Sequence, residues 1–130
     1  MKQTPLPDSE LAIMDLLWGN EWLTARQIRE QLYSHSSKAQ HGTVQRLLQR
    51  LEEKGYIERD CSQFVHQFRA KVSRQNYTGN QLEMLASKLT AGSFAPLITH
   101  LVEKSKISSD DIEQIKAILD EYRVAGGKND

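Results

Sequence analysis

The stretch from His41 to Asp60, HGTVQRLLQRLEEKGYIERD, restricts the possible folds of this chain more than any other. Its apolar residues recur at the i, i+3, i+4, i+7 spacing of a helix over about Gln40 to Lys54, and Gly55 is placed as a helix stop. That apolar stripe consists of Val44, Leu47, Leu48 and Leu51. The opposite face has no acid, which indicates a polar, negatively charged partner; it consists of Thr43, Gln45, Arg46, Gln49 and Arg50.

Two shorter helices are predicted before this one. The first runs from Asp8, the expected N-cap, to Trp18, where Gly19 ends it. The second follows Thr24, which has Gln27 three residues later, the spacing of a capping box. Its apolar positions end near residue 32.

After Gly55 the pattern changes to that of strands. Two runs, 56–60 and 64–73, flank a tight polar turn at 61–63 and predict an antiparallel hairpin in which Phe64 and Phe68 share one face. Three helices followed by a hairpin is the order of a winged helix-turn-helix. The predicted fold is therefore mainly α with a small β-hairpin: a winged helix-turn-helix DNA-binding domain in residues 1–75 and a three-helix C-terminal dimerisation region in residues 76–130.

The charge distribution supports a nucleic-acid partner, although the chain has 17 basic and 17 acidic residues and no net charge. From Arg26 to Arg74 there are ten Lys and Arg against five Asp and Glu. From Asn76 onward there are six basic and eight acidic residues. A basic centre of this kind suits contact with phosphates.

The third helix is the candidate recognition helix, because the N-terminal residues of that helix touch base edges in the major groove. Glutamine pairs with adenine and arginine with guanine. The predicted base contacts are His41, Gly42, Thr43, Gln45 and Arg46, and Arg50 one turn later is expected to reach a phosphate. The alternative is an ordinary solvated helix face.

Other elements supply further candidate DNA contacts. The helix that starts at Thr24 offers free backbone N–H groups to phosphate, with Arg26 in its first turn. In the hairpin, Gln63, Arg69 and Lys71 are candidates for the DNA backbone or the minor groove. A solvated strand face explains these three residues equally well.

The last fifty or so residues are predicted to be helical, with a capping box at Thr78 and Gln81 and a last helix that starts at Ser108. Three short helices have little area to bury by themselves, so we expect a homodimer; the alternative is that they fold back on the N-terminal domain. The predicted dimer contacts are Leu82, Leu85, Leu89, Phe94, Leu97, Ile98, Leu101, Ile112, Ile115, Leu119 and Tyr122.

Other classes of protein are disfavoured by the motifs. The four histidines, His35, His41, His66 and His100, lack metal-ligand spacing, so neither a metal nor a cofactor is expected. No phosphate-binding glycine loop, nucleophile elbow or HExxH motif is present, so we expect no enzyme. A single cysteine, Cys61, no secretory signal and no apolar segment near ~20 residues indicate a cytoplasmic protein without direct membrane insertion.

Several segments in order resemble the penicillinase repressor (BlaI/MecI) family of bacterial transcriptional regulators. They are LPDSELAIMDLLW, TARQIREQL, GTVQRLLQRLEEKGYIERD and AGSFAPLITHLVEKSKISSDDIEQIKAILDE. The resemblance implies a dimer that binds a palindromic operator and blocks transcription, with interlocked C-terminal helices.

The resemblance also implies a release mechanism. In the best-known members a membrane sensor protease leads to cleavage of an Asn-Phe bond in the dimerisation region, a position that aligns with His100-Leu101. This chain departs from the family there, and its C-terminal VAGGKND lacks the cysteines of copper-responsive relatives. Two alternatives stay open: a winged-helix protein–protein interaction module and a small metal- or redox-sensing regulator.

Overall fold

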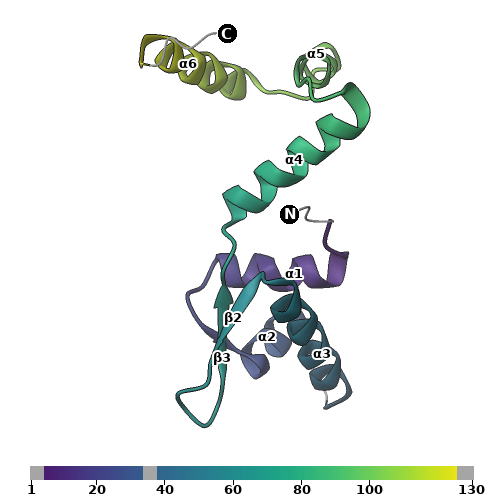
Figure 1. The fold of residues 1–130 in the computed structure, drawn as a ribbon, viewed down its shortest axis with the longest axis vertical. Helices are drawn as coiled ribbons and strands as arrows, with labels where there is room; N and C mark the ends of the chain where they lie inside the picture. The colour runs from purple at the N-terminus through teal and green to yellow at the C-terminus, as the bar shows by residue number, and fades with distance from the viewer. Residues whose placement is uncertain (1–4, 34–37, 126–130) are drawn as a thin grey trace. The chain divides into compact units, whose positions relative to one another are not determined.

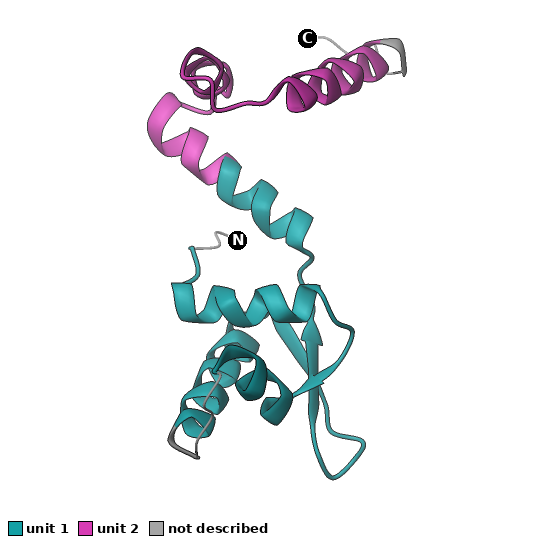
Figure 2. Cartoon of the chain, turned by 180° about the vertical axis from the view of Figure 1, so that it is seen from behind, with its two compact units in different colours: residues 1–82 teal, residues 83–130 magenta. Residues whose placement is uncertain are grey.

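A computed structural model describes residues 5–33 and 38–125 of the chain (Figure 1). The described residues form six helices and three short strands. The chain divides into two compact units, Met1–Leu82 and Glu83–Asp130 (Figure 2). The division falls inside one helix, later than the predicted domain boundary at residue 75.

Unit 1 contains three helices packed around one core. They are α1 (Asp8–Trp18), α2 (Ala25–Leu32) and α3 (Lys38–Lys54). The core includes the predicted stripe of α3, in which Val44 and Leu51 are fully buried, together with Ile13 of α1 and Ile28 of α2. Burying each such side chain contributes roughly 1.5–3 kcal/mol, which is enough to fix the side of α3 that stays exposed.

A small antiparallel sheet completes unit 1. Its strands are β1 (Leu23–Thr24), β2 (Ile57–Asp60) and β3 (Gln67–Ala70), in the order β1-β3-β2. Phe68 of β3 lies between Leu23 and Arg59 and is 4% exposed, so it joins the sheet to the helices. Helices followed by a β2–β3 hairpin confirm the predicted winged helix-turn-helix, and β1 adds a strand that the sequence did not predict.

The first turns of α4 (Arg74–Thr90) pack on unit 1. The Tyr77 hydroxyl accepts a 2.9 Å hydrogen bond from the backbone N–H of Leu6, and Trp18 donates its indole N–H to the carbonyl oxygen of Val72 at 2.8 Å. Arg74 lies over the Trp18 ring and pairs with Asp15 at 3.2 Å. These contacts join the start of α4 to α1.

Unit 2 contains the rest of α4, α5 (Ala95–Glu103) and α6 (Ser109–Ala125). Helix α4 ends at Ala91 and Gly92, both with positive φ, and the Ser108 hydroxyl caps α6 by accepting from the backbone N–H of Asp111 at 3.1 Å. The predicted start of the last helix at Ser108 is therefore confirmed.

Three local predictions were wrong. Helix α1 has Pro7 rather than Asp8 as its N-cap, with no side-chain cap. Helix α4 begins before the predicted Thr78, because the Ser73 hydroxyl accepts from the backbone N–H of Asn76 at 3.0 Å. Phe64 does not share a strand face with Phe68, since β3 begins only at Gln67.

Candidate nucleic-acid interface

The start of α2 is built as its sequence predicts. The Thr24 hydroxyl accepts from the backbone N–H of Gln27 at 3.1 Å, and the Gln27 side chain accepts from the Thr24 N–H at 2.8 Å, which completes the capping box. Arg26 in the first turn pairs with Glu30 at 3.1 Å while its side chain stays 75% exposed. Exposed pairs of this kind are weak, so Arg26 can exchange Glu30 for another anion.

The predicted recognition face lies at the start of α3. Gln45, Arg46 and Arg50 are exposed, and no described residue forms an ion pair with either arginine. Thr43 is half-buried, and Gly42 is exposed with open space where a Cβ would lie. The exposed arginines are therefore available to an outside partner.

His41 is a half-buried member of the predicted base contacts. Its Nε2 lies 3.2 Å from Nε2 of Gln45, and its buried Nδ1 has no hydrogen-bond partner within residues 5–33 and 38–125. Histidine and glutamine thus form a polar pair one helical turn apart, and this pair orients the Gln45 amide at the surface.

We call the hairpin of residues 57–70 the wing. The DNA contacts predicted in and next to it differ in whether their side chains already have partners within unit 1. Gln63 is exposed at the tip, and Lys71 just beyond β3 is also exposed. The Arg69 side chain donates to Glu58 on β2 at 2.6 Å and lies 4.7 Å from the Trp22 ring centre. Arg69 therefore has two partners within unit 1 already.

A cavity of about 290 Å³ separates the start of α3 from the wing. No acidic side chain of the described residues lines it, and it includes several predicted contacts. Its lining residues are Thr24, Ala25, Arg26, His41, Gln45, Arg59, Phe64, Val65, His66 and Phe68. The fold thus brings Thr24, Arg26, His41 and Gln45 together at one end of unit 1.

Arg59 and His66 are part of this cavity, although the sequence did not single them out as contacts. Arg59 pairs with Glu52 at 2.8 Å, lies 4.8 Å from the Phe68 ring centre and approaches His66 Nδ1 at 3.2 Å. The hydrogen bond to Glu52 raises the pKa of Arg59 above its usual range. Arg59 lies two residues after the buried Ile57 on β2, so strand alternation is the signal that could have indicated its place near the core.

Cys61 is an exposed free thiol whose Sγ lies 3.8 Å from His66 Nδ1. Across the described parts of the chain, no three His, Cys, Asp or Glu side chains are grouped to hold a metal ion. Among the same residues, no helix combines the length and the apolar character that crossing a membrane requires.

Comparison with known proteins identifies the family. Residues 6–121 match the family described as penicillinase repressor. The chain belongs to the penicillinase repressor family of transcriptional regulators. The resemblance seen in the sequence is thereby confirmed.

Two members of the penicillinase repressor family illustrate the likeness. The transcriptional regulator BlaI of Mycobacterium tuberculosis (strain H37Rv) is 30% identical over 128 residues, which are 97% of this chain and 91% of BlaI. The methicillin resistance regulatory protein MecI of Staphylococcus aureus (strain N315) is 25% identical over 118 residues, 91% of this chain and 95% of MecI. These relatives are named as regulators and not as enzymes.

One solved structure resembles the chain in fold. RosR of H. salinarum, in the RosR-S4 complex, superposes with a TM-score of 0.51 at 19% identity. The match covers 92% of this chain and 91% of RosR. At this identity the likeness concerns the fold alone.

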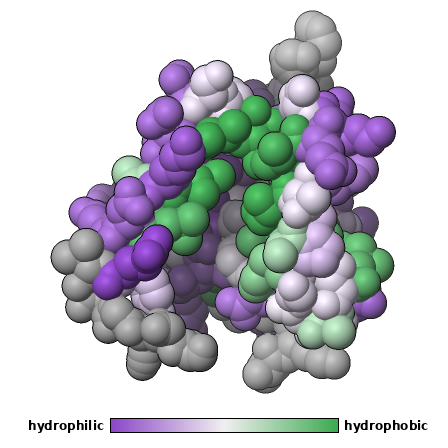
Figure 3. All heavy atoms as spheres, turned by 90° about the horizontal axis from the view of Figure 1, so that it is seen from above, coloured by the Kyte–Doolittle hydropathy of each residue, from purple (hydrophilic) through white to green (hydrophobic). Residues whose placement is uncertain are grey.

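Leu82, at the end of unit 1, and positions in unit 2 make up the set that the sequence assigned to dimerisation in this penicillinase repressor homologue. Leu97 and Ile112 are half-buried, and the others are exposed. Leu89 is 65% exposed, and Val102 and Ile118, which the sequence did not single out, are exposed as well. Figure 3 shows hydrophobic residues in open view, flanked by hydrophilic ones, on the face that it draws.

The predicted cleavage position lies in a regular helix. His100 and Leu101 are exposed residues of α5, and the carbonyl oxygen of His100 accepts from the backbone N–H of Lys104 at 3.0 Å. Exposed loop tips are the preferred sites of proteolysis. Cleavage between His100 and Leu101 would therefore require α5 to unwind locally.

Proposed function

We propose that this protein is a cytoplasmic transcriptional repressor that binds palindromic, double-stranded operator DNA as a homodimer. The single observation that carries the proposal is the acid-free cavity between the start of α3 and the wing, in a winged-helix member of a repressor family. With the N-terminal turns of α3 in the major groove, Gln45 and Arg46 meet base edges. The adjacent sugar–phosphate strand then passes through the cavity.

The residues around this cavity have complementary roles in the proposal. Backbone N–H groups at the start of α2, with Arg26, face a phosphate. Arg50, one turn beyond Arg46 on the exposed face, contacts a second phosphate and contributes affinity without reading sequence. Gln63 and Lys71 are the hairpin contacts with exposed side chains, and Arg69 joins them only if DNA displaces Glu58.

The first test is an anisotropy titration with duplexes that cover the DNA upstream of the protein's own gene. Arg46→Ala should lose about 1–3 kcal/mol of discrimination at one base pair, and Arg50→Ala should lower the salt slope by about one with little change in specificity. Lys104→Ala is the matched control, because Lys104 is an exposed cation outside unit 1. Salt-insensitive binding, or equal affinity for shuffled sequences, would refute the proposal in favour of a protein-interaction module.

The second part of the proposal is the dimer. Its support is the exposed apolar face of α4, α5 and α6, because an isolated unit of this size gains by covering such side chains. Two linked DNA-binding units bind half-sites one helical turn or a multiple apart. Losing the link removes the second unit's effective concentration, so affinity should fall by roughly 10²–10⁴.

A pair of charge substitutions on neighbouring positions tests the dimer. Leu89→Glu should yield a monomer in sedimentation velocity, since it places a charge on the apolar face. Lys88→Glu, on an exposed position next to it, should leave the dimer intact. A wild-type monomer at micromolar concentration, or a dimeric Leu89→Glu variant, contradicts the assignment.

Release from DNA then follows from any signal that separates the C-terminal helices. A membrane sensor protease that cuts between His100 and Leu101 is one such signal, with the local unwinding of α5 as its physical requirement. The test is limited proteolysis of the protein alone and bound to its operator, with the cleavage site read by mass spectrometry.

A further inference from the structure

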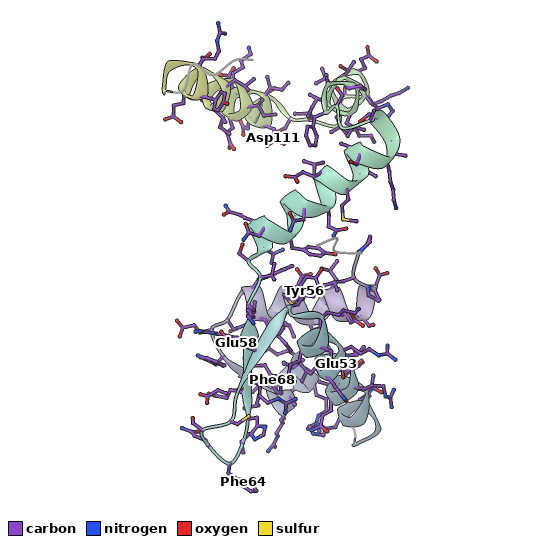
Figure 4. All side chains as sticks on the ribbon, in the orientation of Figure 1. Glu53, Tyr56, Glu58, Phe64, Phe68 and Asp111 are labelled. Carbon is purple, nitrogen blue, oxygen red and sulfur yellow. The ribbon has the colours of Figure 1, made fainter. Side chains whose placement is uncertain are left out.

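The tip of the wing carries an apolar side chain that is fully exposed. Phe64 is 100% exposed and its neighbour Val65 is 56% exposed (Figure 4). Phe68, also in the wing, is 4% exposed and does the packing on the core. A phenylalanine side chain has on the order of 150–250 Å² of surface, and in the isolated chain Phe64 leaves this apolar surface exposed to water.

The tip lies at the end of unit 1 where the predicted recognition helix begins. In Figures 1 and 2 the hairpin tip and the N-terminal end of α3 both project at the end away from α1. The cavity of about 290 Å³ lies between them, with His41 and Gln45 on one side and Phe64 on the other. In duplex DNA one sugar–phosphate strand separates the major groove from the adjacent minor groove. A strand seated in the cavity therefore has α3 in its major groove and the wing tip at its minor groove.

The charge of the tip also suits the minor groove. From Cys61 to Val72 the chain has no Asp or Glu. The nearest acid, Asp60, accepts from the backbone N–H of Ser62 at 2.9 Å at the base of the turn. Nothing at the tip repels phosphates, while Gln63 beside Phe64 can donate to the A·T acceptors of the groove floor.

We propose that Phe64 is an apolar wedge that enters the minor groove beside the recognition helix, partially unstacks one base step and bends the operator. The proposal rests on the proposed function, which supplies the DNA. Apolar side chains inserted between base steps kink a duplex by roughly 20–90°. The ring has no hydrogen-bonding group, so it selects steps that open easily, namely the pyrimidine–purine steps TA and CA/TG. Phe64 thus adds specificity at a position that no polar side chain reads.

The experiment compares wild type with Phe64→Gln and Phe64→Leu. Glutamine removes the wedge and keeps a polar side chain of similar length, whereas leucine is itself a wedge residue. Val65→Thr is the matched control, because it changes an adjacent exposed apolar side chain with little change in shape. Since Phe64 is fully exposed, all variants should keep the thermal midpoint of the wild type.

Two readouts report the wedge directly. Upstream duplexes with 2-aminopurine at successive pyrimidine–purine steps should gain fluorescence at one step in each half-site when the wild-type dimer binds, and end-to-end energy transfer should report a bend. Phe64→Gln should lose the fluorescence increase and the bend, and its affinity for the duplex should fall about tenfold or more. Phe64→Leu and Val65→Thr should keep most of the fluorescence increase, the bend and the affinity.

The outcomes separate this proposal from the one on which it rests. If the wild-type protein binds no duplex, the proposed repressor function itself is refuted. If the wild-type protein binds with salt and sequence dependence but increases the fluorescence of no 2-aminopurine step, only the wedge proposal is refuted. Unchanged affinity and bending in Phe64→Gln would also refute the wedge proposal. A change in oligomeric state in Phe64→Gln would refute it as well, because the ring would then contact protein and not DNA.

Discussion

Tyr56 and Tyr77 are two buried phenols whose hydroxyl groups have opposite surroundings, and changing each to phenylalanine should shift stability in opposite directions. Their rings meet edge to face with centroids 5.8 Å apart, and the residues are 3% and 8% exposed. Tyr77 Oη accepts from the Leu6 N–H at 2.9 Å. Tyr56 Oη, near the join of α3 and β2 (Figure 4), is buried and has no hydrogen-bond partner among the described residues.

The magnitudes follow from these contacts. A buried hydroxyl without a partner costs about 1–3 kcal/mol, so Tyr56→Phe should stabilise unit 1 by about 1 kcal/mol at neutral pH. Tyr77→Phe leaves the Leu6 N–H buried without its acceptor and should cost about 1–3 kcal/mol. Both changes keep the rings, so packing contributes little to the difference between them.

The effect of Tyr56→Phe should grow at alkaline pH. Burial, and then the electrostatic interactions with Tyr77 and Glu10, raise the pKa of Tyr56 above its ordinary value of 10.0. A folded pKa above the unfolded one gives stability that is complete below pH 10 and is lost as pH rises through the folded pKa. Phenylalanine at position 56 removes that loss.

Urea unfolding followed by tryptophan fluorescence measures these effects, because both tryptophans, Trp18 and Trp22, belong to unit 1. Tyr122→Phe in unit 2 is the control, since Tyr122 is 59% exposed. Midpoints are compared at a common m-value. Destabilisation by Tyr56→Phe would show that the hydroxyl has a partner, and a Tyr77→Phe variant as stable as wild type would refute the role given to the Leu6 hydrogen bond.

Two further predictions concern charged groups of unit 1. Lys54→Met leaves the Glu10 carboxylate, 1% exposed and 2.6 Å from Lys54 Nζ, buried without its cation. Urea unfolding of the variant should show a loss of about 2–4 kcal/mol in the free energy of unfolding. This loss is smaller than for a fully buried pair because Lys54 is 39% exposed. Adding Glu10→Gln to the Lys54→Met variant should restore part of the lost stability. The backbone hydrogen bond from Ser62 lowers the pKa of Asp60, so the stability it gives is present above the unfolded pKa of about 3.8 and is lost as pH falls through the folded one. Asp60→Asn should flatten the fall of the urea midpoint as pH drops below about 3.8, and an unchanged fall contradicts this assignment.

The parts of the fold that the sequence predicted are those fixed by local chemistry. The α2 capping box needs only Thr24 and Gln27, and both hydrogen bonds form. Gly55 ends α3 with a positive φ of 86°, which glycine adopts without strain. The apolar stripe of α3 is buried because its period of 3.6 leaves one face for the core.

The errors arose where two local signals compete or where contacts are distant. Thr78 and Gln81 have capping-box spacing, but the hydroxyl of Ser73 caps the helix earlier. Phe64 fits a period of two, yet that period cannot distinguish a strand from a turn, and the strand starts at Gln67. The two residues of β1 pair only with β3, a partner distant in sequence, so no local pattern identifies them.

The candidate interface was predictable in part for the same reason. Helix position alone indicates that Gln45, Arg46 and Arg50 face outward. The cavity needs the tertiary fold, because it joins the start of α2, the start of α3 and the wing. Arg59 and His66 became visible as part of it only with that packing.

The continuity of α4 restricts how its length can change between relatives. One unbroken helix carries Tyr77, buried in unit 1, and Leu89, on the proposed dimer face. Each residue of an α-helix adds about 100° of rotation and about 1.5 Å of length. One residue inserted between Tyr77 and Leu89 would therefore rotate Leu89 by about 100° around the helix axis relative to Tyr77. Seven inserted residues nearly restore the phase and lengthen the helix by roughly 10 Å. We therefore expect the length of α4 to change between relatives by whole turns.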